Sequence, residues 1–181
     1  GAFGPQSLSK ALPWYVRAAD GGDARAMRWL ADAYASGTAL PRNGRTAAIW
    51  RMRAARAGDV VAMRRVGQDL LASGQPAATA QGINFLRRAA RQGDAAAMHE
   101  LADAITSRSA DAAALAEAAD WYRSAASAGR PEAQYQIGMM YMQGLGVERA
   151  PARARSWLEA ARKNGVGMAE AALAALKVLE Q

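Results

Sequence analysis

The stretch from Trp121 to Tyr141, WYRSAASAGRPEAQYQIGMMY, contains the unit from which this chain is built. Counting forward from Trp121, Ala125 follows after four residues, Gly129 after eight and Ala133 after twelve. Residues that lie four apart in a helix share one face, so the aromatic residue and the first alanine are expected to point the same way. The spacing predicts two helices that meet at Gly129.

The same frame occurs five times, at steps of 35 or 36 residues. The aromatic position is occupied by Trp14, Trp50, Phe85, Trp121 and Trp157. The first alanine and the glycine that follow this position are present in every copy. Self-similarity at this period predicts an all-α solenoid of about five helix-turn-helix repeats.

Glycine is expected to end the first helix of each pair, because without a Cβ atom it adopts the left-handed conformation of a helix C-cap. Asp23, Asp59 and Asp94 follow the glycine in three copies, where a carboxylate can cap the next helix and interact favourably with its dipole. A single pair of such Ala-rich helices cannot bury both of its faces. Neighbouring copies are therefore expected to stack into one continuous core.

The repeats occupy essentially the whole chain, which predicts one domain over residues 1–181. Because the sequence opens inside a repeat, we expect this domain to be part of a longer protein. Helices are predicted at residues 7–20, 23–36, 44–57, 59–72, 78–91, 94–107, 111–128, 131–143, 151–164 and 167–180. The connection at residues 107–111 has Arg108 where a glycine would be expected, and is predicted to be partly helical.

The composition limits the classes of protein that fit. The 181 residues are 51% hydrophobic, but no run reaches the roughly 20 apolar residues of a membrane helix. The net charge of +7 is uneven, since residues 1–90 hold 13 Lys and Arg against 5 Asp and Glu, whereas residues 91–181 hold 10 against 11. The absence of Cys excludes disulfides and thiol catalysis. It leaves the compartment open, with the periplasm favoured over the cytoplasm.

Two segments of the fourth copy, AQYQIGMMYMQGLGV at residues 133–147 and ARSWLEAA at residues 154–161, carry a family resemblance. They resemble the Sel1-like repeat, a 36-residue relative of the tetratricopeptide repeat. The matching residues are Ala133, Ile137, Gly138, Tyr141, Gly144, Gly146, Val147, Ala154, Trp157 and Ala161. The chain departs from the pattern where Leu70 and Ile105 replace the tyrosine and where Lys177 ends the series. The version of the family with two cysteines in each repeat is excluded.

The resemblance implies a right-handed α-solenoid whose groove binds a protein partner, as an adaptor in bacterial envelope assembly, exopolysaccharide export, secretion or signalling. In such a stack the groove would be lined two and six residues after the second alanine of each repeat. The residues at these positions are Arg28, Asp32, Arg64, Gln68, His99, Asp103, Tyr135 and Met139, and Met142 is also predicted to line the C-terminal end of the groove. The methionines would form an adaptable surface for peptide side chains. The alternative is that this face is solvated and that the methionines pack against the next repeat.

A second candidate surface is a row of arginines on the aromatic helices, formed by Arg17, Arg53 and Arg88. Such a row is suited to an acidic protein, an anionic polysaccharide or lipid headgroups. It supports the rival hypothesis of a glycan-binding module for acidic exopolysaccharide or peptidoglycan. The alternative is again a solvated face. Nucleic acid is not expected as a partner, because no exposed aromatic residues alternate with the arginines.

Neither catalysis nor a cofactor is predicted. His99 is the only histidine, and no metal-ligand cluster or phosphate-binding glycine loop is present. His99 and Asp103 lie one helical turn apart and could act as a base and the group that orients it, but no nucleophile accompanies them. The aromatic column could be mistaken for a ligand-stacking ladder, and we expect it to pack in the core instead.

Overall fold

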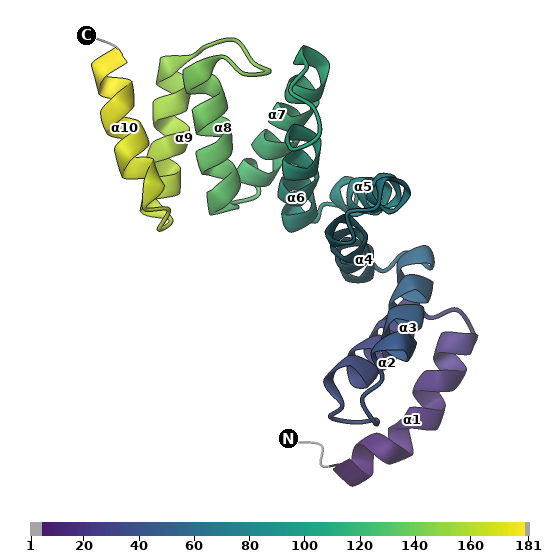
Figure 1. Cartoon of the computed structure of the whole chain (residues 1–181). Helices are drawn as coiled ribbons and strands as arrows, with labels where there is room; N and C mark the ends of the chain where they lie inside the picture. The colour runs from purple at the N-terminus through teal and green to yellow at the C-terminus, as the bar shows by residue number, and fades with distance from the viewer. Residues whose placement is uncertain (1–4, 180–181) are drawn as a thin grey trace. The chain divides into compact units, whose positions relative to one another are not determined.

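The computed structural model describes residues 5–179, with side chains from residue 11 onward, and within that range it contains α-helices and no strands (Figure 1). The helices are α1 (Pro5–Asp20), α2 (Ala24–Ser36), α3 (Gly44–Arg56), α4 (Val60–Ala72), α5 (Pro76–Arg91), α6 (Ala95–Thr106), α7 (Ala112–Ser127), α8 (Pro131–Gln143), α9 (Pro151–Lys163) and α10 (Met168–Leu179). The predicted all-α class is confirmed. The predicted boundaries are correct to within two residues, apart from residue 180, which lies outside the described range.

We call α2, α4, α6, α8 and α10 the A helices and α1, α3, α5, α7 and α9 the B helices. Each B helix leads into the next A helix through the predicted glycine, which has a φ between 87° and 104° in every copy. In three copies the aspartate that follows caps the A helix. The side chains of Asp23, Asp59 and Asp94 each accept a hydrogen bond from an amide three residues later, at 2.7 or 2.8 Å. These local predictions are confirmed.

The connection between α6 and α7 differs from the expectation of partial helix. Ser107 and Arg108 form a turn after α6, and the Ser109 hydroxyl donates to Asp111 Oδ2 at 2.6 Å. Asp111 Oδ1 accepts from the Ala114 amide at 2.8 Å and caps α7. The hydrogen bond from Ser109 is the largest of several that lower the pKa of Asp111. Two side-chain hydrogen bonds therefore shape this connection where glycine is missing.

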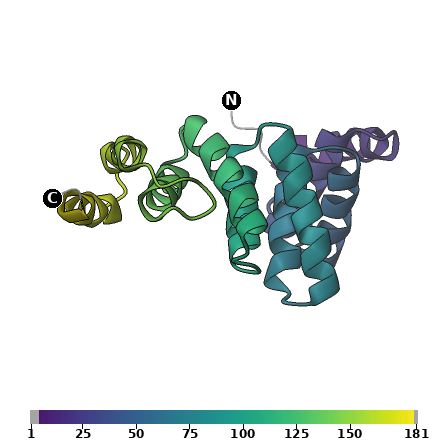
Figure 2. The same cartoon turned by 90° about the horizontal axis from the view of Figure 1, so that it is seen from above.

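The chain divides into two compact units, residues 1–89 and residues 90–181. In the N-terminal unit, α2 packs between α1 and α3, and α4 packs on α3. In the C-terminal unit, α7 packs between α6 and α8, and α9 packs between α8 and α10. Figure 1 shows α8, α9 and α10 side by side, and Figure 2 shows the last two helices nearly end-on. The single domain over residues 1–181 stays a prediction.

The core consists of small residues that allow close helix contact and larger residues that fill the remaining space. In the B helices the first alanine of the repeat is fully buried in four copies, at Ala54, Ala89, Ala125 and Ala161. Leu30, Leu101 and Ile137 of the A helices are also fully buried. Complete burial of a side chain of this size stabilises the fold by about 1.5–3 kcal/mol.

The aromatic column lies at the rim of this core, contrary to the prediction that it packs inside. Trp14 is 67% exposed, and the other four rings are half-buried. The residue after the aromatic position points inward instead, because one residue along a helix rotates the side chain by about 100°. Leu86, Tyr122 and Leu158 occupy this inner position and are buried. The sequence predicted the correct helices, but the buried residue is the one after the aromatic position and not the aromatic residue itself.

Within residues 5–179, none of the helices combines the length and the apolar character that a bilayer span requires.

Candidate partner-binding clefts

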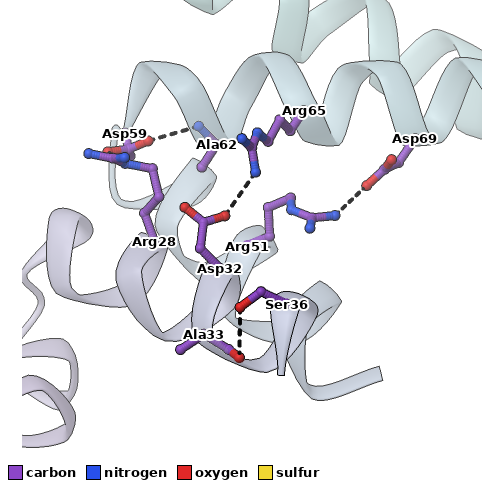
Figure 3. A network of polar contacts seen from close by, with 9 residues as sticks. All are labelled: Arg28, Asp32, Ala33, Ser36, Arg51, Asp59, Ala62, Arg65 and Asp69. Atoms are coloured by element: carbon purple, nitrogen blue, oxygen red, sulfur yellow. Dashed lines mark hydrogen bonds and ion pairs between the residues drawn. The ribbon is translucent and has the colours of Figure 1, made fainter. Parts of the chain in front are cut away.

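In the N-terminal unit, the predicted groove residues of α2 form ion pairs with α4 (Figure 3). Arg28 Nε lies 2.9 Å from Oδ2 of Asp59, the residue that caps α4. Asp32 Oδ1 lies 2.8 Å from Arg65 Nη1. The side chain of Asp59 is only 8% exposed, so loss of Arg28 would leave a largely buried charge without its ion-pair partner and would cost more than breaking an open surface pair. These contacts connect consecutive A helices.

The same two residues also line a surface cleft of about 540 Å³ between α1 and α2. Its walls include three aromatic residues, Trp14, Tyr15 and Trp29, of which the last two stack with ring centroids 3.9 Å apart. Arg28 and Asp32 are therefore accessible from this cleft while α4 fixes their positions. The other predicted groove residues of this unit, Arg64 and Gln68, are half-buried and exposed, respectively.

In the C-terminal unit, the predicted groove residues Asp103 and Met139 line a cleft of about 360 Å³ formed by α6, α7 and α8. The remaining lining residues are Thr106, Ser107, Leu115, Tyr122, Gln136, Met140, Gln143 and Leu145. The structure therefore unites two predicted residues that lie 36 positions apart in the sequence.

Asp103 is held in place by its neighbours. Its Oδ1 atom accepts a hydrogen bond of 2.5 Å from the Tyr122 hydroxyl, and its Oδ2 atom lies 3.3 Å from Nδ1 of His99. The rings of His99 and Tyr122 meet edge to face with centroids 5.7 Å apart. Burial of Tyr122 and its contact with Asp103 raise the pKa of its phenol well above the usual range. The phenol is therefore a hydrogen-bond donor to Asp103 at neutral pH.

His99 itself contributes little accessible surface, because its side chain is 13% exposed, against 47% for Asp103. His99 was predicted as a groove residue, but in the structure it is largely buried and contacts the groove residue Asp103. The residues described by the structure contain no group of three or more His, Asp or Glu side chains suited to a metal ion.

Two predicted residues do not line this cleft. Met142 is only 8% exposed and belongs to the core, so its prediction as a partner-binding residue is wrong. It faces inward because it lies four residues beyond the buried Gly138, on the same face of α8. Tyr135 is half-buried on α8 but does not contribute to the wall.

Sequence reasoning missed a neighbouring column of the A helices, one residue beyond the predicted one. In this column, Trp29 lines the first cleft and Gln136 lines the second. Arg65, in the same column, pairs with Asp32. It also missed Leu145, which is 42% exposed at the second cleft. This second column could have been predicted, because a helical face is wide enough to include more than one residue in each turn.

The arginine row lies on the B helices of the N-terminal unit, and its three side chains are exposed. The Arg53 guanidinium lies 4.2 Å from the centre of the Trp50 ring and pairs with Asp20 at 3.3 Å. Arg88 lies 5.8 Å from the centre of the Phe85 ring. Arg17 occupies the equivalent position on α1. Coverage of the half-buried aromatic column accounts for much of this row without an anionic ligand.

Taken together, the repeated helix pairs and their accessible clefts define an α-solenoid of the scaffold type. The sequence pattern of the Sel1 repeat matches residues 1–23, 24–59, 60–94, 95–129 and 131–166, and the chain belongs to this family. Sel1-repeat proteins generally mediate protein–protein interactions, and their fold is generally not enzymatic.

Solved structures of the same family resemble the chain. A Sel1 repeat protein from Oxalobacter formigenes is 26% identical with a TM-score of 0.72, over 97% of this chain and 70% of that one. A protective antigen of uropathogenic Escherichia coli with an SLR fold is 24% identical with a TM-score of 0.48, over 90% and 43% of the two chains. A putative Sel1 repeat protein from Klebsiella pneumoniae is 22% identical with a TM-score of 0.40, over 91% and 98%. No curated protein sequence matches the chain.

Proposed function

We propose that this chain is a non-enzymatic adaptor that binds a segment of a partner protein along its A helices. The observation that carries the proposal is the position of four predicted groove residues in two accessible clefts. Arg28 and Asp32 line the cleft between α1 and α2, and Asp103 and Met139 line the cleft of the C-terminal unit. Each cleft combines apolar side chains with a few fixed polar groups, which is the usual composition of a recognition site.

The biological setting of the proposal is bacterial, in envelope assembly, exopolysaccharide export, secretion or signalling. The family resemblance suggests these processes, and the similar protein from Oxalobacter formigenes is itself bacterial. A protein partner is favoured over an anionic polysaccharide because the clefts contain apolar walls beside the predicted groove residues, whereas the arginine row covers aromatic rings on the B helices.

The proposal is tested by affinity capture from a bacterial lysate with the full chain, followed by mass spectrometry. Met139→Ala and Gln136→Ala, which alter residues of the cleft wall, are expected to reduce recovery of the specific partner. Met168→Ala is the matched control, because Met168 is 64% exposed at the start of α10 and lies outside both clefts. Circular dichroism of each variant verifies the fold.

Capture at low and high salt separates the two classes of partner. A protein contact with apolar side chains should persist at high salt, whereas binding of an anionic polymer should weaken as salt screens the charges. Recovery that is unchanged by the groove substitutions but lost in an Arg17→Glu and Arg88→Glu double variant would refute the groove proposal in favour of the arginine row.

A further inference from the structure

The cleft of α6, α7 and α8 has a distinctive distribution of charge and apolar surface. Asp103 is the only side chain that carries a formal charge at neutral pH among the residues that line it. The surrounding groups are apolar, from Leu115, Met139, Met140 and Leu145, or neutral and polar, from Thr106, Ser107, Tyr122, Gln136 and Gln143. The cleft therefore presents one negative charge beside an apolar wall and offers no positive charge to an acidic ligand.

The carboxylate is fixed before any ligand arrives. Tyr122 donates to one oxygen and His99 lies next to the other, while about half of the side chain remains exposed. Each carboxylate oxygen can accept more than one hydrogen bond, so both retain capacity for a further donor. A cation at this position would gain a charge-assisted hydrogen bond without the entropy cost of ordering Asp103.

The apolar wall is also fixed in position, by the loop that connects α8 to α9. Gly144 and Gly146 adopt φ values of 74° and 67°, and Leu145 lies between them. The Leu145 amide donates to the Met140 carbonyl at 3.1 Å. A Cβ atom on Gly146 would collide with the backbone of Leu115. The two glycines thus allow the loop to lie against α7 and to hold Leu145 at the cleft.

The dimensions suggest the length of the ligand. Gln136, Met139, Met140 and Gln143 lie at successive turns along one face of α8. From Gln136 to Gln143 the helix rises about 10 Å, which corresponds to about three residues of an extended peptide. The two glutamine amides can pair with the backbone of such a segment, because each offers both donors and an acceptor.

We infer that this cleft recognises a short extended protein segment in which a Lys or Arg, placed against Asp103, lies within about three residues of an aliphatic side chain, placed against Met139 and Leu145. This inference rests on the proposed function and specifies the chemistry of its partner. The negative charge of Asp103 disfavours an acidic peptide, and the apolar wall that includes Met139 and Leu145 disfavours a glycan.

The inference is tested by selecting peptides from a random display library with the full chain as bait. Enriched peptides should contain a basic residue near Leu, Ile, Val or Met. Affinities are then measured for Asp103→Asn, which keeps the size and the acceptor for Tyr122, and for Leu145→Ser, which alters an exposed loop side chain. We expect about fivefold weaker binding for the first variant and about tenfold weaker binding for the second.

The controls separate failure of the inference from failure of the proposed function. Asp20→Asn removes an ion-paired aspartate of the N-terminal unit and should leave affinity unchanged. Peptides that lose affinity with Leu145→Ser but not with Asp103→Asn would overturn the basic-residue inference and leave the groove proposal standing. Enrichment of acidic peptides would also overturn it. If the library yields no peptide that depends on either residue, both proposals fail.

Discussion

Replacing Gly138 with Ala is expected to destabilise the C-terminal unit, because α8 and α9 have no space for a methyl group at this point. The new Cβ would lie 2.8 Å from Leu158 Cγ and 3.3 Å from the Leu158 backbone nitrogen. Leu158 is fully buried, so it cannot move aside freely. Overpacking of this kind costs about 1–3 kcal/mol, and the better helix propensity of Ala offsets about 0.5–1 kcal/mol of that cost.

We therefore expect a net destabilisation of about 1 kcal/mol, which lowers Tm by about 2–4 °C in a chain of this size. Thermal unfolding followed by circular dichroism measures the change. Gly44→Ala is the matched control, because a Cβ atom on Gly44 would meet no atom within 4 Å and its backbone is not left-handed. This control should be neutral or slightly stabilising. A Gly138→Ala variant that melts at or above the wild-type temperature would refute the argument from close packing.

Three further perturbations follow from the same structure. Hydrogen bonds lower the pKa of Asp111, so the ionised side chain should stabilise α7 fully above about pH 4. This stabilisation should be lost as the pH falls through the lowered pKa. Asp111→Asn should therefore lose less stability than the wild type in acid unfolding. Tyr122→Phe should cost about 1 kcal/mol in denaturant unfolding, and in an alkaline absorbance titration it should remove a phenol that ionises well above pH 10. Gly146→Ala should lower Tm more than Gly138→Ala does, because it adds a backbone collision to a left-handed φ.

The repeat frame was predictable because each of its signals depends on local chemistry. Glycine at the end of a B helix and aspartate at the start of an A helix act within one turn of the chain. Five copies of the same spacing then determine the helix order. The contact between Gly138 and Leu158 could not be predicted from the repeat frame, because Ala102 and Tyr122 occupy the equivalent positions one repeat earlier. The pair of residues that a given repeat accepts at these two positions depends on how side chains pack between neighbouring helices.

The candidate site was predictable only in part, for the same reason. Periodicity indicated the turns of the A helices that carry Asp103 and Met139, but it could not distinguish an accessible Met139 from the buried Met142. The support of Asp103 by Tyr122 joins residues 19 positions apart and depends on the packing of α6 against α7. Such contacts have no signature in the spacing of a single helix.

The most direct test of the account is methionine-methyl NMR of the full chain, titrated with the highest-affinity peptide from the library selection. The chain contains eight methionines, of which only Met139 and Met140 line the cleft of the C-terminal unit. We predict that these two signals shift in proportion to peptide binding, while the exposed Met168 does not respond. Saturating peptide that leaves both signals unchanged, combined with loss of binding on substitution of Arg17, Arg53 and Arg88, would contradict the groove account.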